Sequence, residues 1–487
     1  MGDGKRGAEW PAGTEQKTDD ADTAWPGEPP DLGVDLAELE AAAREISAAK
    51  DEPEWMLHHR LDSLERFPDL PMPDWPGQPD LGPVDLGKVI PYVRPDVEPP
   101  TEGDGEGEDA GRSWRDLPES FRETYERLGI PDAERDALAG TGAQADSESI
   151  YHAIQERYAD EGVIFCSMEA AVREHPDLVR EYFMTAVTPD AHRFAALHGA
   201  LWSGGSFVYV PENVTVDLPV HAYFWMGQPG SGQFAHKVIV AEKGAEVHYI
   251  EGCSAPRFNA VNLDAGAVEV FVGEDARVQH SKIQNWSRNT YALTSDRAIV
   301  EKGGHVDWIA GTLGSKVSMG YPASYLRGRG ASANYVMVTV AESGQNLDTG
   351  AKVLFEAPDT SATVQAKSIA KGGGRTNFRG LVRALGDVRN ATASVDCSAL
   401  MFDTESISAT MPSIEVEGEG VTVAHEASVG RIGVDEVFYL QTRGLDEGQA
   451  KGLIVSGFID PITSELPLPY ALELNRLVRL EMAGTLG

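Results

Sequence analysis

Gly244-Ala245-Glu246-Val247 is the first of four similar segments in which a tight turn leads directly into a strand-like pair of residues. The others are Asp275-Ala276-Arg277-Val278, Gly303-Gly304-His305-Val306 and Gly330-Ala331-Ser332-Ala333, at intervals of 31, 28 and 27 residues. A repeat of this length is typical of a β-solenoid, whose coils bury their inner faces only by stacking on one another. A β-sandwich is the alternative, because turns every 8 to about 12 residues also suit it.

The repeats lie within a longer β-rich region, and the composition changes on both sides of it. Residues 206–432 consist of short runs of Val, Ile, Thr and aromatic residues broken by Gly, Asp or Asn, so we expect the β core there. A disordered acidic tail is expected over 1–34, and an N-terminal helical segment with a Pro/Gly/acidic linker over 35–112. Apolar residues recur at helical spacing over 113–205 and 433–487, which predicts two further helical regions.

The charge balance limits the classes of partner. The 487 residues include 41 basic and 77 acidic side chains, a net charge of -36. A field this negative repels phosphate backbones and anionic membranes, so we expect no nucleic-acid or membrane partner. Strong acidity is also one adaptation to a saline cytoplasm and indicates a halophilic host, although an ordinary acidic surface is the alternative.

The cysteines and the N-terminus indicate the compartment. Only Cys166, Cys253 and Cys397 occur, an odd number, so a disulfide framework does not stabilise this chain. The first twenty residues lack the apolar core of a signal peptide, and no run reaches the length of a membrane span. We therefore expect a cytoplasmic protein.

Cys397 and His425 are the strongest candidate pair for metal chemistry. They are 28 residues apart, which matches the repeat, so they would occupy equivalent positions on neighbouring coils, roughly 4.8 Å apart. Thiolate is a ligand that iron-sulfur clusters prefer, imidazole suits iron and zinc, and Glu426 would add a hard, labile ligand. In a regular strand His425 and Glu426 point to opposite faces, so either a bulge re-aims one or their roles differ. The alternative is a small core cysteine and a packed His-Glu pair.

The other two cysteines differ from each other in their surroundings. Cys253 stands in Glu251-Gly252-Cys253-Ser254-Ala255-Pro256, which predicts a turn at a strand end and an accessible thiol. It precedes Cys397 by 144 residues, about five coils, so both thiols would lie on one wall roughly 24 Å apart. Cys166 follows Val163-Ile164-Phe165 and is expected to be buried and inert.

Several motifs together resemble the SufB family, the scaffold subunits of the SUF iron-sulfur cluster assembly system. They are Trp202-Ser203-Gly204-Gly205-Ser206-Phe207-Val208-Tyr209-Val210-Pro211, the segment 251–256, Gln284-Asn285-Trp286, Gln345 with Asp348-Thr349-Gly350, Phe378-Arg379-Gly380-Leu381-Val382 and Ala424-His425-Glu426-Ala427. The similarity extends from Lys50 to Leu477, nearly the whole chain.

The resemblance implies a fold and a site. The fold would be a right-handed parallel β-helix core flanked by N-terminal and C-terminal helical regions. Cys253 would accept sulfur, while Cys397 and Glu426 would act in building the cluster. Cys397, His425 and Glu426 would hold the metal.

The resemblance also implies partners. The paralogue SufD would bind through the β-helix, the ATPase SufC would bind through the C-terminal helices, and a further protein would donate sulfur. The cluster would be held transiently, reduced flavin is a further cofactor to consider, and ATP would act only through SufC. This chain has no Gly-rich phosphate loop, in agreement with a scaffold that is not itself an enzyme.

Five positions depart from the pattern of the family. Trp225 and Gly227 replace a usual Arg and Asn, Asp296 replaces a Lys, Ala235 a Glu and Asp264 a His. The family residues at these positions are associated with the sulfur route through the β-helix, so the departures put sulfur delivery in question. A SufD-like structural partner, or a divergent paralogue that lacks sulfur transfer, is therefore the main alternative, and a polysaccharide-active β-helix enzyme is a more distant one.

Overall fold

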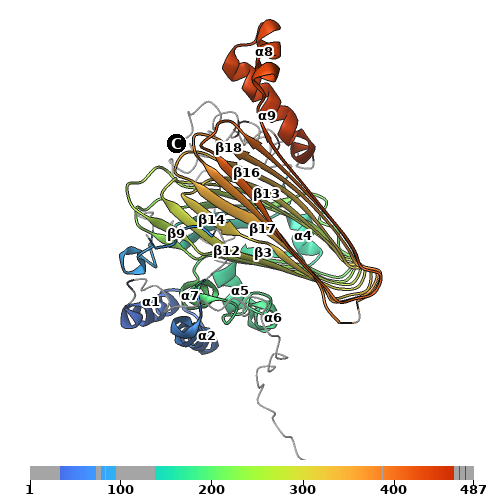
Figure 1. Ribbon diagram of the computed structural model, residues 1–487. Coiled ribbons are helices and arrows are strands. Elements are labelled where there is room, and N and C mark those ends of the chain that lie inside the picture. The colour runs from blue at the N-terminus through green and yellow to red at the C-terminus, as the bar shows by residue number, and fades with distance from the viewer. Residues whose placement is uncertain are drawn as a thin grey trace, which may run out of the picture.

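The protein is a parallel β-helix of about eight turns, seen in a computed structural model. The structure describes residues 33, 35–72, 78–82, 84–94, 138–386 and 388–464, together with 471, 476 and 478. Two large sheets form the walls of the coil (Figure 1), and the strands within them are parallel apart from the pairs β1–β2 and β3–β4. The predicted β-solenoid is confirmed.

The first wall is a ten-stranded sheet. Its order is β2 (Glu148–Ile154), β1 (Gly140–Ala145), β5 (Val220–Trp225), β8 (Glu246–Ser254), β11 (Arg277–Trp286), β13 (His305–Gly314), β16 (Ser332–Ala341), β18 (Ser361–Ala370), β20 (Thr392–Met401) and β22 (Thr422–Arg431). From β5 onward each strand belongs to the next coil of the chain. Side chains at equivalent positions of successive coils therefore lie side by side in rows across this wall.

The second wall is a twelve-stranded sheet. Its main order is β21 (Ile407–Val416), β19 (Arg375–Ala384), β17 (Asn346–Phe355), β14 (Val317–Gly320), β12 (Thr290–Val300), β10 (Ala267–Val272), β7 (His236–Ala241), β4 (Gly205–Val210) and β3 (Ile164–Ser167). Three short strands lie off this path: β6 (Gly232–Gln233), β9 (Asn262–Asp264) and β15 (Ala323–Leu326).

One corner of each coil is a residue with left-handed backbone. These residues have φ between 56° and 76° and are Asn213, Gly244, Asp275, Gly303, Gly330, Asp359, Asn390 and Gly420. Gly lacks a Cβ, and Asn and Asp tolerate this region better than other side chains, so all eight residues suit the turn. Successive corners are hydrogen-bonded, as where the Gly244 N–H donates to the Glu274 carbonyl at 2.8 Å. The repeated segments of the sequence are therefore stacked corners.

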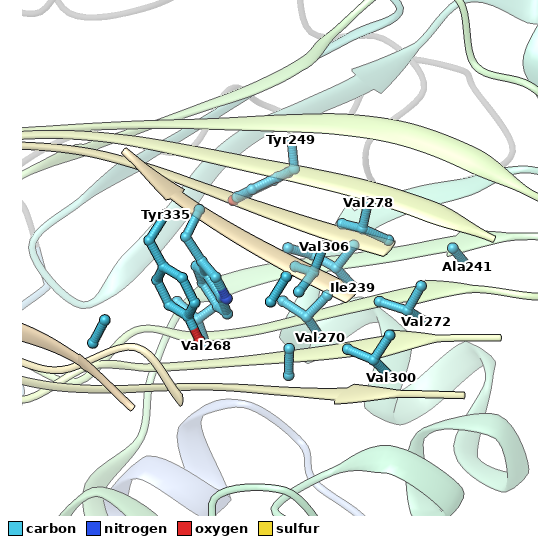
Figure 2. Packing of buried hydrophobic residues seen from close by; sticks show 14 of the residues in the cluster. Ile239, Ala241, Tyr249, Val268, Val270, Val272, Val278, Val300, Val306 and Tyr335 are labelled. Atoms are coloured by element: carbon cyan, nitrogen blue, oxygen red, sulfur yellow. The ribbon is translucent and has the colours of Figure 1, made fainter. Parts of the chain in front are cut away.

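The interior of the coil is filled largely by β-branched side chains and alanines. Figure 2 shows Val268, Val270 and Val300 from one wall facing Val278 and Val306 from the other, and all five are at most 1% exposed. Branched side chains pack well on a pleated surface, and stacked coils place equivalent side chains against one another. This packing holds the two walls at a fixed separation.

Helices cover the outer face of the twelve-stranded sheet (Figure 1). They are α1 (Leu36–Ala49), α2 (Glu54–Arg66), α5 (Met168–Glu174), α6 (Pro176–Tyr182) and α7 (Arg193–Leu201), with α4 (Glu156–Asp160) and the 3-10 turns η1 (Phe67–Asp69) and η2 (Leu86–Lys88) nearby in the chain. The apolar stripe Leu39, Ala43 and Ile46 of α1 is buried in a cluster that reaches Leu263 and Leu293 of the sheet. The predicted N-terminal helix is confirmed.

The helical region predicted over 113–205 needs a correction. Residues 138–205 contain α4 to α7, but also the strands β1, β2 and β3. The β1 segment is rich in Gly and Ala and has little strand propensity of its own, so its pairing with β5 along Gly140 to Ala145 decides its structure. The acidic tail, residues 95–137 of the linker and following region, and most of 465–487 lie outside the described residues.

Two helices follow the last coil. They are α8 (Val434–Thr442) and α9 (Glu447–Thr463), and they project from that end of the β-helix (Figure 1). Val455 and Ile459 of α9 pack on the outer face of the ten-stranded sheet against a cluster that includes Val338 and Ile369. The end of the β-helix and its helical appendage are thus joined by apolar packing.

Candidate functional site

The last coil brings Cys397 and His425 together. Cys397 Sγ lies 3.5 Å from His425 Nε2. The register differs from the expected one, because Cys397 pairs with Ala427 and His425 pairs with Val395. This coil uses 30 residues between the corners Asn390 and Gly420, rather than 28. The two side chains still meet because residues two apart in a strand share a face.

Gly380 makes room for the imidazole. It lies on β19 in the opposite wall, where a Cβ would stand 3.7 Å from His425 Cε1 and 3.1 Å from Phe378 Cε1. A larger side chain at this position would press on both rings. Sequence reasoning noted Gly380 only as part of a motif, since nothing local indicates that a residue 45 positions later packs against it.

Glu426 is not brought to this pair. It is exposed and pairs in register with Asp396, whose side chain is also exposed. The strand β22 is regular through these residues, so alternation places Glu426 on the face opposite His425. The structure therefore joins two of the three predicted metal ligands and separates the third.

The protonation of the pair sets its chemistry. Burial, and secondarily the charge of Asp396, raises the pKa of the Cys397 thiol to about 12. Burial lowers the pKa of His425, so its imidazole is neutral and keeps a lone pair at neutral pH. A metal would have to displace the thiol proton, and a neutral imidazole would be ready to bind.

Two donor atoms alone, Cys397 Sγ and His425 Nε2, do not complete the coordination of a metal ion. Within the described part of the chain, no group of three His, Cys, Asp or Glu side chains is placed to hold a metal ion. Among the described strands, β21 and β22 end their sheets, and each pairs with a neighbour on one side only. The Cys397–His425 pair therefore stands next to the end of both sheets.

Cys253 lies in a contrasting position. It was expected in an exposed turn, but it belongs to β8 and is 4% exposed in the interior, so that expectation is wrong. Gly252 beside it has low strand propensity, but the pairing of β5 and β11 on either side of β8 holds this segment in a strand. The thiol donates a hydrogen bond to Glu251 Oε1 at 3.1 Å. Burial, followed by the charge of Glu251, raises the pKa of Cys253 well above its usual range.

Glu251 is the centre of a buried cluster of charges. Its carboxylate lies 3.1 Å from Lys237 Nζ, 3.6 Å from Lys282 Nζ and 3.5 Å from His280 Nε2. Although burial opposes ionisation, Lys237 and Lys282 hold the pKa of Glu251 well below its ordinary value. Lys237 comes from β7, on the wall opposite β8, so sequence reasoning had no signal for this cross-interior pair.

Two of the five unusual positions belong to this interior. Asp296 Oδ2 lies 3.8 Å from Lys282 Nζ, and Asp264 Oδ2 accepts a hydrogen bond from Trp286 Nε1 at 2.9 Å. Burial raises the pKa of Asp264. Two acids thus stand close to the lysines that neutralise Glu251. The interior therefore carries both signs of charge near Cys253.

The other three unusual positions are spread around the end of β5. Ala235 is buried in the main core, and Trp225 is partly exposed. The Gly227 N–H donates to Asp146 Oδ1 at 2.8 Å. These residues contribute no charge to the interior.

Cys253 and Cys397 occupy the same wall of the β-helix. Both belong to the ten-stranded sheet, with β11, β13, β16 and β18 between their strands. Five strand spacings correspond to roughly 24 Å. Cys166 lies apart on β3, and it is partly exposed rather than fully buried as predicted.

The chain matches two family models and several curated proteins. Residues 224–458 match the model described as SUF system FeS cluster assembly, SufBD core domain, and residues 146–222 match the SufBD protein N-terminal region. An iron-sulfur cluster assembly SufBD family protein of Staphylococcus saprophyticus is 42% identical over 448 residues, covering 92% of this chain and 94% of that protein. One from Staphylococcus epidermidis is 42% identical over 443 residues, covering 91% and 92%.

The chain belongs to the SufBD family. Its general role is in iron-sulfur cluster assembly by the SUF system. The parallel β-helix and the Cys397–His425 pair are therefore features of an iron-sulfur assembly protein. The family assignment leaves no argument for a polysaccharide-active enzyme. In the described residues, none of the helices combines the length and apolar character needed to cross a membrane.

Proposed function

We propose that this chain is a SufB-type scaffold that accepts sulfur and iron and builds a nascent cluster at the end of its β-helix. The observation that carries the proposal is the 3.5 Å approach of Cys397 Sγ to His425 Nε2 on the last coil. Thiolate and imidazole are suitable iron ligands, and two ligands hold a cluster weakly enough for release. The scaffold itself performs no ATP hydrolysis.

The open end of the β-helix is where a SufD-type paralogue would bind. Four apolar side chains on the two end strands are 40 to 52% exposed: Ile407, Ile414, Val416 and Val429. Unpaired strand edges with exposed apolar side chains favour pairing with another sheet. A second β-helix stacked here would cover these residues and would supply ligands beside Cys397 and His425.

The helix α8 is the proposed docking surface for the ATPase SufC. Val434, Phe438 and Tyr439 are 84, 63 and 56% exposed, and Leu453 of α9 is 54% exposed. An amphipathic helix with an uncovered apolar face is a common way to bind a partner's groove. ATP would then act through the partner, and its hydrolysis would pull on the same end that holds Cys397.

Cys253 is the proposed sulfur acceptor, and a cytoplasmic location fits this role. None of the three cysteines forms a disulfide, as reactive thiols require. A sulfur atom bound at Cys253 would travel along the ten-stranded wall toward Cys397. Anaerobic reconstitution with and without reduced flavin tests whether flavin is a cofactor of this step.

The second candidate is a SufD-like partner or a divergent paralogue without sulfur transfer. The observation that favours it is the interior near Cys253, where Asp264 and Asp296 stand beside Lys282 and the thiol is sealed and protonated. Such a subunit would hold the ATPase and complete the dimer. It would retain the fold without delivering sulfur.

Anaerobic reconstitution with ferrous iron and sulfide separates the two candidates. A SufB-type scaffold should develop the optical and Mössbauer signals of a cluster, and Cys397→Ala should lose most of them. Cys166→Ala is the matched control, because this thiol lies on β3, far along the chain from the last coil, and should leave the signals unchanged. Equal iron binding by wild type and Cys397→Ala would refute the proposed site.

A further inference from the structure

The twelve-stranded wall is interrupted at one level. β12 pairs with β14 as far as Thr294, and with β15 from Arg297 onward, which leaves Ser295 and Asp296 between the two short strands. The connecting residues are Tyr321 and Pro322. β17 spans the same interruption from its other side, pairing with both short strands. A continuous ladder seals a wall, so a missing segment is the natural place for an opening.

Cavities lie on both sides of this interruption. The outer groove is lined by residues that include Phe194, Arg297, Tyr321 and Lys352. The inner chamber lies between the walls and is lined by residues that include His280, Lys282, Gln284 and Gly320. Thr294 and Asp296 line both cavities, so the groove and the chamber meet at the strand break.

The chamber contains a polar atom without a hydrogen-bond partner. In the described part of the chain, Asp296 Oδ1 is buried and accepts no hydrogen bond. Buried polar groups are normally satisfied, so this atom indicates room for water or a small polar solute. The inward-facing Thr294 and Thr312 are also partly exposed here, whereas Val270 and Ala298 in neighbouring positions are fully buried.

A chain of polar contacts leads from the chamber to Cys253. Asp296 Oδ2 is 3.8 Å from Lys282 Nζ, which is 3.6 Å from Glu251 Oε1. The same Glu251 oxygen accepts the Cys253 thiol hydrogen bond at 3.1 Å. Gln284 lines the chamber and is the register partner of Cys253 on the next strand.

We propose that the break between β14 and β15 is a lateral port through which inorganic polysulfide reaches Cys253. The inference deepens the proposed function, because it rests on Cys253 as the sulfur acceptor and names the donor class. Arg297 and Lys352 in the groove and Lys282 in the chamber would attract the anion. The buried position of Cys253 favours a donor of a few atoms over direct contact with a partner protein's thiol.

The transfer step balances without a further oxidant. The Cys253 sulfur attacks the terminal sulfur of a hydrogen disulfide as the thiol loses its proton. A new S–S bond forms at Cys253 as the donor's S–S bond breaks, and the second donor sulfur leaves as hydrosulfide and takes up the proton. The donor sulfur is reduced while Cys253 becomes a persulfide.

The test plugs the port from inside. A Cβ on Gly320 would meet only Thr294 Oγ1, at 3.5 Å, so Gly320→Leu should fill the chamber beside the break without a backbone clash. The full chain is incubated anaerobically with sodium polysulfide, and sulfur gain at each cysteine is followed by mass spectrometry after alkylation. Gly320→Leu should slow sulfur gain at Cys253 by about tenfold or more while leaving Cys166 and Cys397 unchanged.

Two further variants complete the design. Gly452→Leu, where a Cβ meets nothing within 4 Å, is the matched control and should react like wild type. Thr294→Ile narrows the same break from β12 and should also slow sulfur gain at Cys253. This second variant keeps the test valid if Gly320→Leu folds poorly. Equal rates in both plugged variants and wild type, or no sulfur gain at Cys253 in wild type, would overturn the port.

The outcome is separable from that of the proposed function. Sulfur gain at Cys253 requires no iron and no partner, whereas cluster reconstitution reports on Cys397. If Gly320→Leu slows sulfur gain at Cys253 but the wild type forms no cluster on reconstitution, the port is supported and the scaffold function is rejected. If the wild type forms a cluster but the plugged variants gain sulfur at the wild-type rate, the scaffold function is supported and the port is rejected.

Discussion

Cys253 and Cys397 share one wall of the β-helix but not one environment. Cys253 is surrounded by the charges of Glu251 and its lysines in the middle of the coil, with folded strands on both sides. Cys397 is buried as well, but its partner His425 is only partly covered and stands on the last strand of its sheet. Position along the solenoid therefore separates a sealed thiol from one whose neighbourhood a second molecule can complete.

We therefore expect the middle of the coil to contribute most to the stability of the fold, and the end of the coil to bind and release ligands. An interior charge such as Glu251 is tolerated only because opposite charges neutralise it. Polar atoms and potential metal ligands on the end coil need no partner within the chain, since solvent or another molecule reaches them.

Glu251→Ala should be the most damaging change. It would leave Lys237 and Lys282 buried beside each other without their shared carboxylate, at a cost of about 3–5 kcal/mol in the free energy of unfolding. Urea denaturation at neutral pH measures this cost. The control is Glu426→Ala at the exposed end, which should change the free energy by less than about 0.5 kcal/mol. Similar losses in both variants would contradict the distinction.

Gly380→Val should weaken metal binding at the end of the coil. Its side chain would press on Phe378 and displace the His425 ring, which should lower the affinity for Co²⁺ about 10–100-fold. The thiolate-to-cobalt absorption provides the titration signal. Gly430→Val lies on the same last coil, where a Cβ meets nothing within 4 Å, and should bind like wild type. Unchanged affinity in Gly380→Val would show that His425 is not a ligand.

Metal affinity at Cys397 should rise with pH. The folded protein keeps the thiol proton at neutral pH because the pKa is raised to about 12, and a metal must release that proton. His425 is already neutral and releases none, because its pKa is lowered. One released proton corresponds to about a tenfold gain in Co²⁺ affinity per pH unit above neutrality. The slope should vanish in Cys397→Ala, and a flat wild-type profile would argue against thiolate ligation.

Glu426→Gln should have the smallest effect. The side chain lies on the face opposite His425, so Co²⁺ affinity of the isolated chain should change by less than about twofold. The same titration measures it. A large loss would mean that β22 rearranges on binding to bring Glu426 beside His425.

Much of the fold was predictable from local signals. The four repeated segments identified the coil because left-handed corners require Gly, Asn or Asp, whatever the neighbouring strands contain. The corners at Asn213, Asp359, Asn390 and Gly420 escaped notice because the residue at the corner and the interval between corners both vary, while the backbone conformation does not. The strand β1 was missed because its Gly and Ala residues have little strand propensity and pairing with β5 forms it, whereas β2 and β3 are short and stand among helices.

The candidate site was predictable only to the level of the coil. The amino-acid sequence by itself determined that Cys397 and His425 fall on neighbouring turns of the solenoid, since the interval between them approximates the repeat. The tertiary structure decided the register, the separation of Glu426, the burial of Cys253 and the pairing of Glu251 with Lys237 across the interior. The physical reason is that spacing along a chain fixes which coil a residue joins, whereas side-chain contacts depend on how both walls pack.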